Sequence, residues 1–316
     1  MQAAFYSRQG PATEVFTVGE QPTPQPGPGE VRVRLRTSGV NPSDWKSRKG
    51  GFGRTLGYSL VIPHSDGAGD IDAVGEGVAA SRIGERVWIW NGQWNRAFGT
   101  AAEYIALPSA QAVRMPDRLD YADAACLGIP AFTALQAVRL ARVQPGMHVL
   151  VAGGAGSVGH YAVQLAKRQG ATVLATVSSE AKAAHARAGG ADHVINYRSE
   201  DVGARVQALT GGGVDAVIEM DLTANVGLYP AAVRPRGTIV VYGTGGPQAV
   251  LPSTWFMRNQ ITMTAVLIYE ISDADRQAGL RELDALLREG ALKHTVALRL
   301  PLADTARATT RWNRVL

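Results

Sequence analysis

Continuously apolar runs alternate with helix-like segments through the middle of this chain. The runs do not alternate with polar residues, which is typical of parallel strands buried on both faces. Repeated strand–helix units of this kind predict an α/β fold built on a Rossmann doubly wound parallel sheet. The predicted strands are 147–153, 171–178, 193–197, 214–220 and 237–243. The predicted helices include 157–169, 180–190, 199–210 and 224–234.

The first part of the chain follows a different pattern. The segment VRVRLRTSGV (31–40) begins with strict alternation of apolar and polar residues, which indicates a half-buried strand. Further short strand candidates recur at intervals of about ten residues, separated by turn residues, as in a small barrel or sandwich. The segment 126–143 is helix-like and marks the change to the strand–helix pattern. A chain of 316 residues with this contrast is expected to form two domains.

Composition argues against several classes of function. The formal net charge is +5, but lysines and arginines form no dense run, so we expect no nucleic-acid partner. No apolar run approaches the roughly 20 residues that span a bilayer, so we expect no membrane partner. The single Cys126 excludes an internal disulfide. The start of the chain lacks the apolar region of a signal peptide, so a cytoplasmic location is expected.

A glycine-rich turn joins the first strand of the strand–helix region to its helix. In this turn Gly153, Gly156 and Gly159 form a GxxGxxG spacing, a variant of the dinucleotide fingerprint. The helix start offers unpaired N–H groups and a positive dipole end to phosphates. The alternative is a purely structural turn. We expect a pyrophosphate site formed by Gly153, Gly154, Ala155, Gly156, Ser157, Val158 and Gly159.

The end of the second predicted strand bears on the choice between NADH and NADPH. NAD-specific folds usually place an acid there for the ribose 2′-hydroxyl, but this strand ends in Ser178 and Ser179. Lys182 can supply positive charge to a 2′-phosphate, and both serine hydroxyls can hydrogen-bond it. The alternative is that one of the serines caps the following helix. We expect NADPH as the cofactor.

Seven segments together give the chain a family resemblance. They are GVNPSDWKSRKG (39–50), IPHSDGAGDIDAVGEGV (62–78), FGTAAEYIALP (98–108), GIPAFTALQAV (128–138), VLVAGGAGSVG (149–159), TVSSEAKAAHARAGGADHVINYR (176–198) and RGTIVVYGTGG (236–246). The chain resembles zinc-independent medium-chain dehydrogenases/reductases of the quinone oxidoreductase (zeta-crystallin-like) family. The resemblance implies a GroES-like β-rich catalytic domain over 1–125, a Rossmann NADPH-binding domain over 126–265 and a return to the catalytic domain over 266–316.

The resemblance also implies roles for individual residues. Asn41 matches an asparagine beside the nicotinamide and the substrate. Ser178 and Lys182 match positions that bind the 2′-phosphate, and Tyr197 matches a tyrosine lining the adenine and 2′-phosphate site. Gly243 and Thr244 match the loop along the nicotinamide side. The structural alternatives are a tyrosine at the core edge and an ordinary turn after a strand.

No metal site is expected. In zinc-dependent relatives a cysteine and a histidine from this half of the chain bind the metal, but Ser65 occupies the usual histidine position and His64 precedes it. A catalytic zinc needs about three protein ligands. His64 is instead expected to be a hydrogen-bonded structural residue.

Without a metal, we expect reduction of an electron-poor acceptor. The first hypothesis is NADPH-dependent reduction of a quinone, by hydride transfer. The second is reduction of an alkenal or enone double bond with the same cofactor. A minor alternative is an RNA-binding or structural, crystallin-like protein.

The predicted catalytic residues are Asn41, Lys46 and Asp44. Lys46 is either a polarising or ribose-binding ammonium or a solvated surface lysine. Asp44 is expected to pair with Lys46 or Arg48, mainly for structure. The expected substrate pocket is apolar and aromatic, because flat walls suit a flat quinone ring. Its candidate residues are Trp45, Trp94 and Phe98.

A homodimer is also expected. The segment ITMTAVLIY (261–269) reads as an edge strand of the Rossmann sheet, and its apolar, β-branched content favours pairing with another chain.

Overall fold

The computed structural model describes residues 1–51 and 55–315. It divides into two compact units, Met1–Ile129 with His294–Leu316, and Pro130–Lys293. The first boundary lies close to the expected 125/126, but the second lies at 293/294 and not at 265/266. The reason is helix α11 (Asp273–Glu289), which packs on α4 of the second unit. There the Arg276 guanidinium lies 5.1 Å from the Phe132 ring centroid.

The second unit is built on a six-stranded parallel sheet. The strand order is β10-β9-β8-β11-β12-β13, so the chain runs outward in one direction and then restarts from the centre in the other. This is the order of a Rossmann doubly wound sheet, and it confirms the predicted fold class. The strands are β8 (His148–Val151), β9 (Thr172–Val177), β10 (His193–Asn196), β11 (Val214–Glu219), β12 (Val233–Val241) and β13 (Thr262–Ala265).

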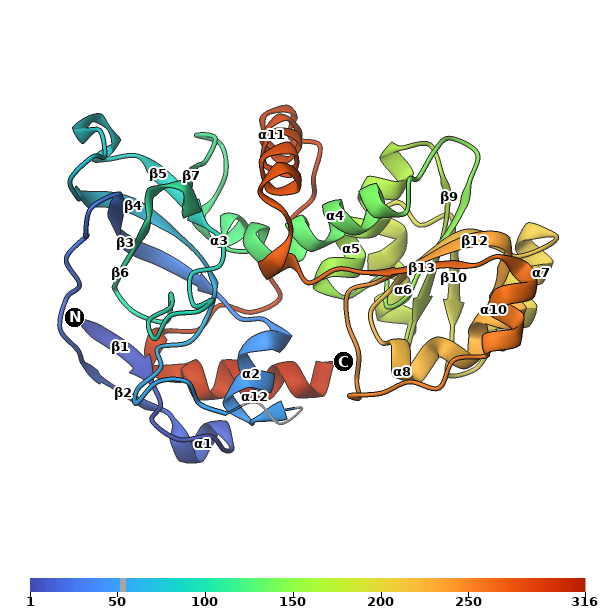
Figure 1. Ribbon diagram of the computed structural model, residues 1–316, viewed down its shortest axis with the longest axis horizontal. Helices are drawn as coiled ribbons and strands as arrows, with labels where there is room; N and C mark the ends of the chain where they lie inside the picture. Colours follow the sequence, from blue (N-terminus) through green and yellow to red (C-terminus); the bar gives the residue numbers. More distant parts are fainter. Residues whose placement is uncertain (52–54, 316) are drawn as a thin grey trace. The chain divides into compact units, whose positions relative to one another are not determined.

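Helices cover both faces of this sheet. Figure 1 shows α4 and α5 on one side of it and α7 and α10 on the other. The second face is closed by an apolar cluster in which Val202 and Val206 of α7 pack with Leu174 and Ile195 of the sheet. The helices are α4 (Phe132–Leu140), α5 (Ser157–Arg168), α6 (Glu180–Ala188), α7 (Val202–Thr210), α9 (Tyr229–Ala232) and α10 (Ser253–Asn259).

Three predicted elements differ from the structure. The helix expected over 224–234 is replaced by short helices, α8 (Leu222–Asn225) and α9, because β12 already begins at Val233. The helix expected over 126–143 begins with a π-helical turn, Leu127–Ala131, that contains Pro130, and continues as α4 only to Leu140. The strand expected over 261–269 extends only over the four residues of β13.

The first unit is dominated by a five-stranded antiparallel sheet in the order β6-β3-β4-β5-β7. The predicted alternation at the start of β3 is confirmed, since Val31 and Val33 are buried while Arg32 and Arg34 face outward. The strands are β3 (Glu30–Gly39), β4 (Asp66–Val74), β5 (Arg86–Ile89), β6 (Tyr104–Pro108) and β7 (Ala112–Arg114).

Smaller elements complete the first unit. A two-stranded antiparallel sheet pairs β1 (Gln2–Phe5) with β2 (Thr17–Glu20). The helices are α1 (Ala12–Val15), α2 (Pro42–Arg48), α3 (Tyr121–Ala124) and α12 (Thr305–Val315). Among the described residues, no helix is both long enough and apolar enough to cross a membrane.

Candidate functional site

The glycine-rich turn has the close backbone packing that its spacing predicted. Gly153 adopts a left-handed φ of 63°, a conformation that favours glycine. A Cβ on Gly159 would lie 2.2 Å from the Gly153 carbonyl oxygen, so only glycine fits at this point of the helix. Gly156 is the N-cap residue of α5 and supplies no capping side chain. The turn therefore closes tightly onto the first turn of the helix.

The start of α5 fits an anionic phosphate group. The first helical hydrogen bond runs from His160 N to Gly156 O over 2.8 Å. The N–H groups of Ser157, Val158 and Gly159 consequently have no acceptor within the helix. Unpaired N–H groups at the positive end of a twelve-residue helix are suited to a pyrophosphate.

Thr176 holds the glycine-rich turn to the neighbouring strand, a contact that the sequence did not predict. Its hydroxyl accepts the Gly153 N–H over 3.0 Å, and its carbonyl accepts the Gly154 N–H over 3.0 Å. Thr176 lies two residues before Ser178 on β9. The turn and the end of β9 are thus fixed relative to each other.

The residues predicted to bind the 2′-phosphate gather at the carboxyl ends of β9 and β10. The Tyr197 N–H donates to the Val177 carbonyl over 3.1 Å, which places Tyr197 beside the residue preceding Ser178. Ser178 is buried, whereas the Tyr197 side chain is 47% exposed. The Ser179 hydroxyl accepts the Lys182 N–H over 3.3 Å and caps α6. Ser179 therefore caps the following helix, which was the structural alternative expected for one of the two serines.

The loop with Gly243 and Thr244 follows β12 and is pinned to the loop after β11. The Thr244 hydroxyl lies 2.9 Å from the Thr223 hydroxyl, and the Asp221 carboxylate accepts the Gly245 N–H over 2.7 Å. Asp221 and Thr223 were not predicted, because nothing local in the sequence links them to residue 244. Because parallel strands end at the same sheet edge, these loops lie on the same edge as the glycine-rich turn.

Asn41 is buried at the start of α2 and is held by two carboxylates. Its backbone N–H donates to Asp44 Oδ2 over 2.6 Å, and its side-chain Nδ2 donates to Asp66 Oδ2 over 2.8 Å. Asp66, the first residue of β4, is fully buried and was not predicted. The sequence did contain a signal for this residue. Asp66 is an acid placed directly before the small residues Gly-Ala-Gly (67–69) of a strand.

Within the part of the chain that the structure describes, Asp44 and Arg48 do not form the ion pair that was expected as one alternative. The Asp44 carboxylate accepts the Asn41 N–H, whereas the buried Arg48 guanidinium donates to the Gly10 carbonyl and lies 5.7 Å from the Phe16 ring centroid. The spacing of Asp44 and Arg48 along one helix suggested a pair, but it did not show that Arg48 packs against the N-terminal segment. Burial raises the pKa of Asp44 to about 7, although the Asn41 N–H opposes this shift.

A chain of hydrogen bonds behind Asn41 fixes the protonation of His64. Thr100 uses its only hydroxyl proton on the Asp66 carbonyl, so it accepts from the Ser38 hydroxyl, 2.8 Å away. Ser38 in turn accepts from His64 Nδ1 over 2.9 Å, so Nδ1 carries the proton. Burial lowers the pKa of His64 to about 4, which keeps the ring neutral near pH 7. The prediction that His64 is a hydrogen-bonded residue is confirmed.

The described residues bring together no set of ligands for a zinc ion. Within residues 1–51 and 55–315, no group of three or more His, Cys, Asp or Glu side chains is arranged to hold a metal ion. Burial raises the pKa of the Cys126 thiol to about 12, and a thiol must lose its proton to bind zinc.

Lys46 and the three aromatic candidates lie on two segments of the first unit. Trp45 and Lys46 are half-buried on α2, and Lys46 Nζ lies 5.8 Å from the Trp45 ring centroid. Trp94 is half-buried and Phe98 is 43% exposed in the segment 90–99. The structure thus gives Lys46 an aromatic neighbour of the cation–π kind and leaves much of Phe98 at the surface.

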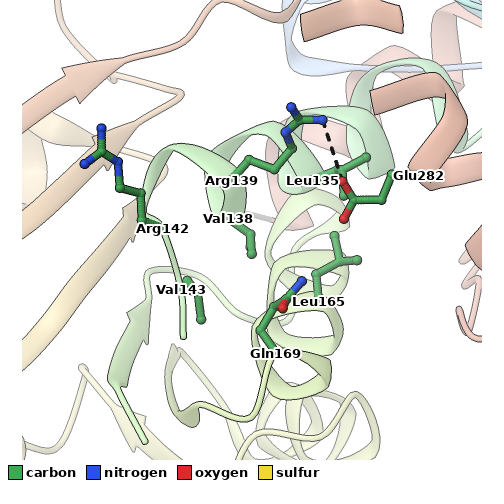
Figure 2. A pocket seen from close by; sticks show the side chains of 8 residues that line it. All are labelled: Leu135, Val138, Arg139, Arg142, Val143, Leu165, Gln169 and Glu282. Atoms are coloured by element: carbon green, nitrogen blue, oxygen red, sulfur yellow. Dashed lines mark ion pairs between the residues drawn. The ribbon is translucent and has the colours of Figure 1, made fainter. Parts of the chain in front are cut away.

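A small cavity of about 130 Å³ lies in the second unit, among α4, α5 and α11. Figure 2 shows Arg139 reaching toward Glu282, at an N–O distance of 3.6 Å, beside the apolar side chains of Leu135 and Leu165. None of the predicted site residues lines this cavity.

Two family models match the chain. The model described as alcohol dehydrogenase GroES-like domain matches residues 27–117, and the model described as zinc-binding dehydrogenase matches residues 157–285. The two matches cover the cores of the two structural units.

Curated and solved relatives extend over nearly the whole chain. Human quinone oxidoreductase is 30% identical over 289 residues, 90% of this chain and 85% of the relative. The solved quinone oxidoreductase of Pseudomonas syringae is 29% identical with a TM-score of 0.88, over 99% of this chain and 96% of that chain. A mycobacterial protein solved in complex with NADPH is 28% identical with a TM-score of 0.89, over 99% of this chain and 97% of that chain.

Proposed function

Because this chain belongs to the quinone oxidoreductase family of medium-chain dehydrogenases/reductases, we propose that it reduces quinones with NADPH and without a metal. The single observation that carries the proposal is the convergence of the glycine-rich turn with Ser178, Lys182 and Tyr197 along one sheet edge. Human and Pseudomonas syringae relatives of this chain are named quinone oxidoreductases.

The chain has residues for each part of NADPH. The N–H groups of Ser157, Val158 and Gly159 bind the pyrophosphate, and Ser178 and Lys182 bind the 2′-phosphate. Tyr197 lies beside this group, where its exposed ring stacks on the adenine. Gly243 and Thr244 contact the nicotinamide side. No carboxylate ends β9, which supports NADPH over NADH.

Bound NADPH supplies a hydride to the electron-poor acceptor. Asn41 positions the nicotinamide and the substrate by hydrogen bonds, and its burial keeps its amide in one place. The Lys46 ammonium stabilises the charge that develops on the quinone oxygen, or else holds the nicotinamide ribose. Trp45, Trp94 and Phe98 provide apolar walls for the flat ring. Solvent supplies the proton.

Assays with paired substrates test the function. We expect NADPH oxidation with 1,2-naphthoquinone or 9,10-phenanthrenequinone that exceeds turnover of 2-alkenals, and slower oxidation of NADH. Rates on 2-alkenals above those on both quinones would instead identify an enone double-bond reductase with the same cofactor site. Activity on neither class would rule out both enzymes. A preparation treated with a chelator should retain full quinone activity.

The proposal includes assembly and location. Two exposed apolar side chains lie on or directly after the edge strand β13, Ala265 and Leu267, the latter 44% exposed. A homodimer that covers this edge would remove an unpaired strand from solvent. Its mass in solution would be about twice the chain mass of 33.4 kDa by light scattering. Because the one cysteine has no disulfide partner in the chain, the fold is suited to the reducing cytoplasm.

A further inference from the structure

We propose that Asp66 is a positioning residue that sets which end of the Asn41 carboxamide faces the reacting groups. The inference rests on the proposed function, which places Asn41 beside the nicotinamide and the substrate. Asp66 Oδ2 accepts two hydrogen bonds, from Asn41 Nδ2 over 2.8 Å and from the backbone N–H of Ile129 over 3.2 Å. All three residues lie in the same structural unit.

A carboxamide has two ends of similar shape but opposite chemistry. The NH₂ end only donates hydrogen bonds and the oxygen end only accepts them, so a rotation of the amide by half a turn reverses what Asn41 offers to a ligand. The Asp44 carboxylate binds the backbone of Asn41, and the Asp44 backbone N–H meets the Asn41 side chain in the capping box of α2. At the NH₂ end, the partner of the Asn41 amide is the Asp66 carboxyl, which only that end can satisfy.

Asp66 specifies one orientation in both of its protonation states. Burial raises the pKa of Asp66 well above its usual range and the nearby Asp44 raises it further, while the hydrogen bonds from Asn41 and Ile129 lower it. A proton on this carboxyl would occupy Oδ1, because Oδ2 already accepts the Ile129 N–H. Oδ2 remains an acceptor either way, so the NH₂ group of Asn41 faces Asp66. The Asn41 carbonyl oxygen, which meets the Asp44 N–H in the capping box, keeps a second lone pair that can accept from a ligand.

The surroundings of Asp66 keep the carboxyl in place. A Cβ on Gly128 would lie 2.3 Å from Oδ1, so the absence of a side chain at residue 128 makes room for this oxygen. On the main chain, the Asp66 carbonyl accepts the Thr100 hydroxyl. The side chain has no exposed surface. A group this restricted orients its partner without moving during turnover.

Steady-state kinetics of four variants test the inference. Asp66→Ala removes the acceptor and should lower kcat roughly 10- to 100-fold while the Kd for NADPH changes little, since the phosphate-binding turn is untouched. Asp66→Asn keeps an acceptor oxygen toward Ile129 and Asn41, so it should restore most of the activity. Asn41→Ala should itself lower kcat, and the double variant Asn41→Ala/Asp66→Ala should be no slower than Asn41→Ala.

The outcomes separate this inference from the proposed function. Full activity of Asn41→Ala would overturn the proposed role of Asn41. A large loss in Asn41→Ala with a further, additive loss in the double variant would overturn only the role of Asp66. The Asp66→Asn variant carries the test even if Asp66→Ala does not fold. A fall in its kcat of more than about tenfold, with NADPH binding intact, would contradict the inference and indicate that the charge or proton of Asp66 is needed.

Discussion

The backbone N–H of Gly153 donates to the Thr176 hydroxyl over 3.0 Å, joining the glycine-rich turn to the strand that ends beside Ser178. The two residues are 23 positions apart in the sequence. This bond connects the proposed pyrophosphate site with the proposed 2′-phosphate site, so a change at Thr176 should affect cofactor binding without touching the cofactor.

We expect Thr176→Val to weaken NADPH binding by about five- to tenfold. The substitution preserves the shape of the side chain but leaves the Gly153 N–H without its acceptor, a loss of about 1 kcal/mol or slightly more. Titration of protein fluorescence with NADPH measures the Kd. Thr176→Ser should bind like the wild type, and Thr172→Val, at the far end of β9, is the matched control. Equal affinity of Thr176→Val and wild type would contradict this role of the hydroxyl.

Lys182→Ala should weaken NADPH binding by roughly tenfold and leave NADH binding nearly unchanged. The reason is that only NADPH carries the 2′-phosphate that this ammonium is proposed to meet. Isothermal titration with both cofactors measures the ratio. Arg187→Ala on the same helix removes the same charge but from a side chain paired with Glu180, so its ratio should match the wild type. A parallel loss for both cofactors would argue against a 2′-phosphate contact.

The buried Asp44 should make stability depend on pH. Its pKa is raised to about 7, so the folded protein keeps a proton here that the unfolded chain loses from about pH 4 upward. The stabilising contribution is therefore complete below about pH 4 and is lost as the pH rises through about 7. Asp44→Asn removes this titration and keeps an oxygen that can accept the Asn41 N–H.

Urea unfolding at several pH values measures the effect. Relative to wild type, the free energy of unfolding of Asp44→Asn should rise by on the order of a few kcal/mol between about pH 4 and pH 8. Comparison with wild type cancels the titration of His64, whose lowered pKa acts in the opposite direction. Asp44→Asn also removes the charge that raises the pKa of Asp66, and this change adds to the same rise. Asp117→Asn, an exposed change in the same unit, should show a difference that varies little with pH. A constant difference for Asp44→Asn would show that its carboxyl does not titrate in this range.

Local patterns in the sequence were sufficient for most of the fold and for the phosphate-binding turn. Three patterns carried this information: the strand–turn–helix order, the spacing of Gly153, Gly156 and Gly159, and the alternation of Val31 and Val33 with arginines. Each pattern arises because residues close in the sequence constrain one another's backbone geometry or burial. Such requirements act over a few positions, so they are visible without the tertiary structure. The position at which the second unit ends was harder to predict from the sequence. Helix α11 belongs to this unit because it packs on α4, and its own sequence does not show that contact.

The amino-acid sequence by itself determined the doubly wound sheet, the turn at its edge and a helix after the two serines Ser178 and Ser179. Only the tertiary structure decided that Thr176 binds the turn, that Asp44 binds the Asn41 backbone and that Asp66 holds the Asn41 amide. The physical reason is that a buried polar group must find a partner wherever the packed chain brings one, at whatever distance in the sequence. For Asn41, at the start of α2, that partner is 25 residues away on strand β4, and it is chosen by the fold.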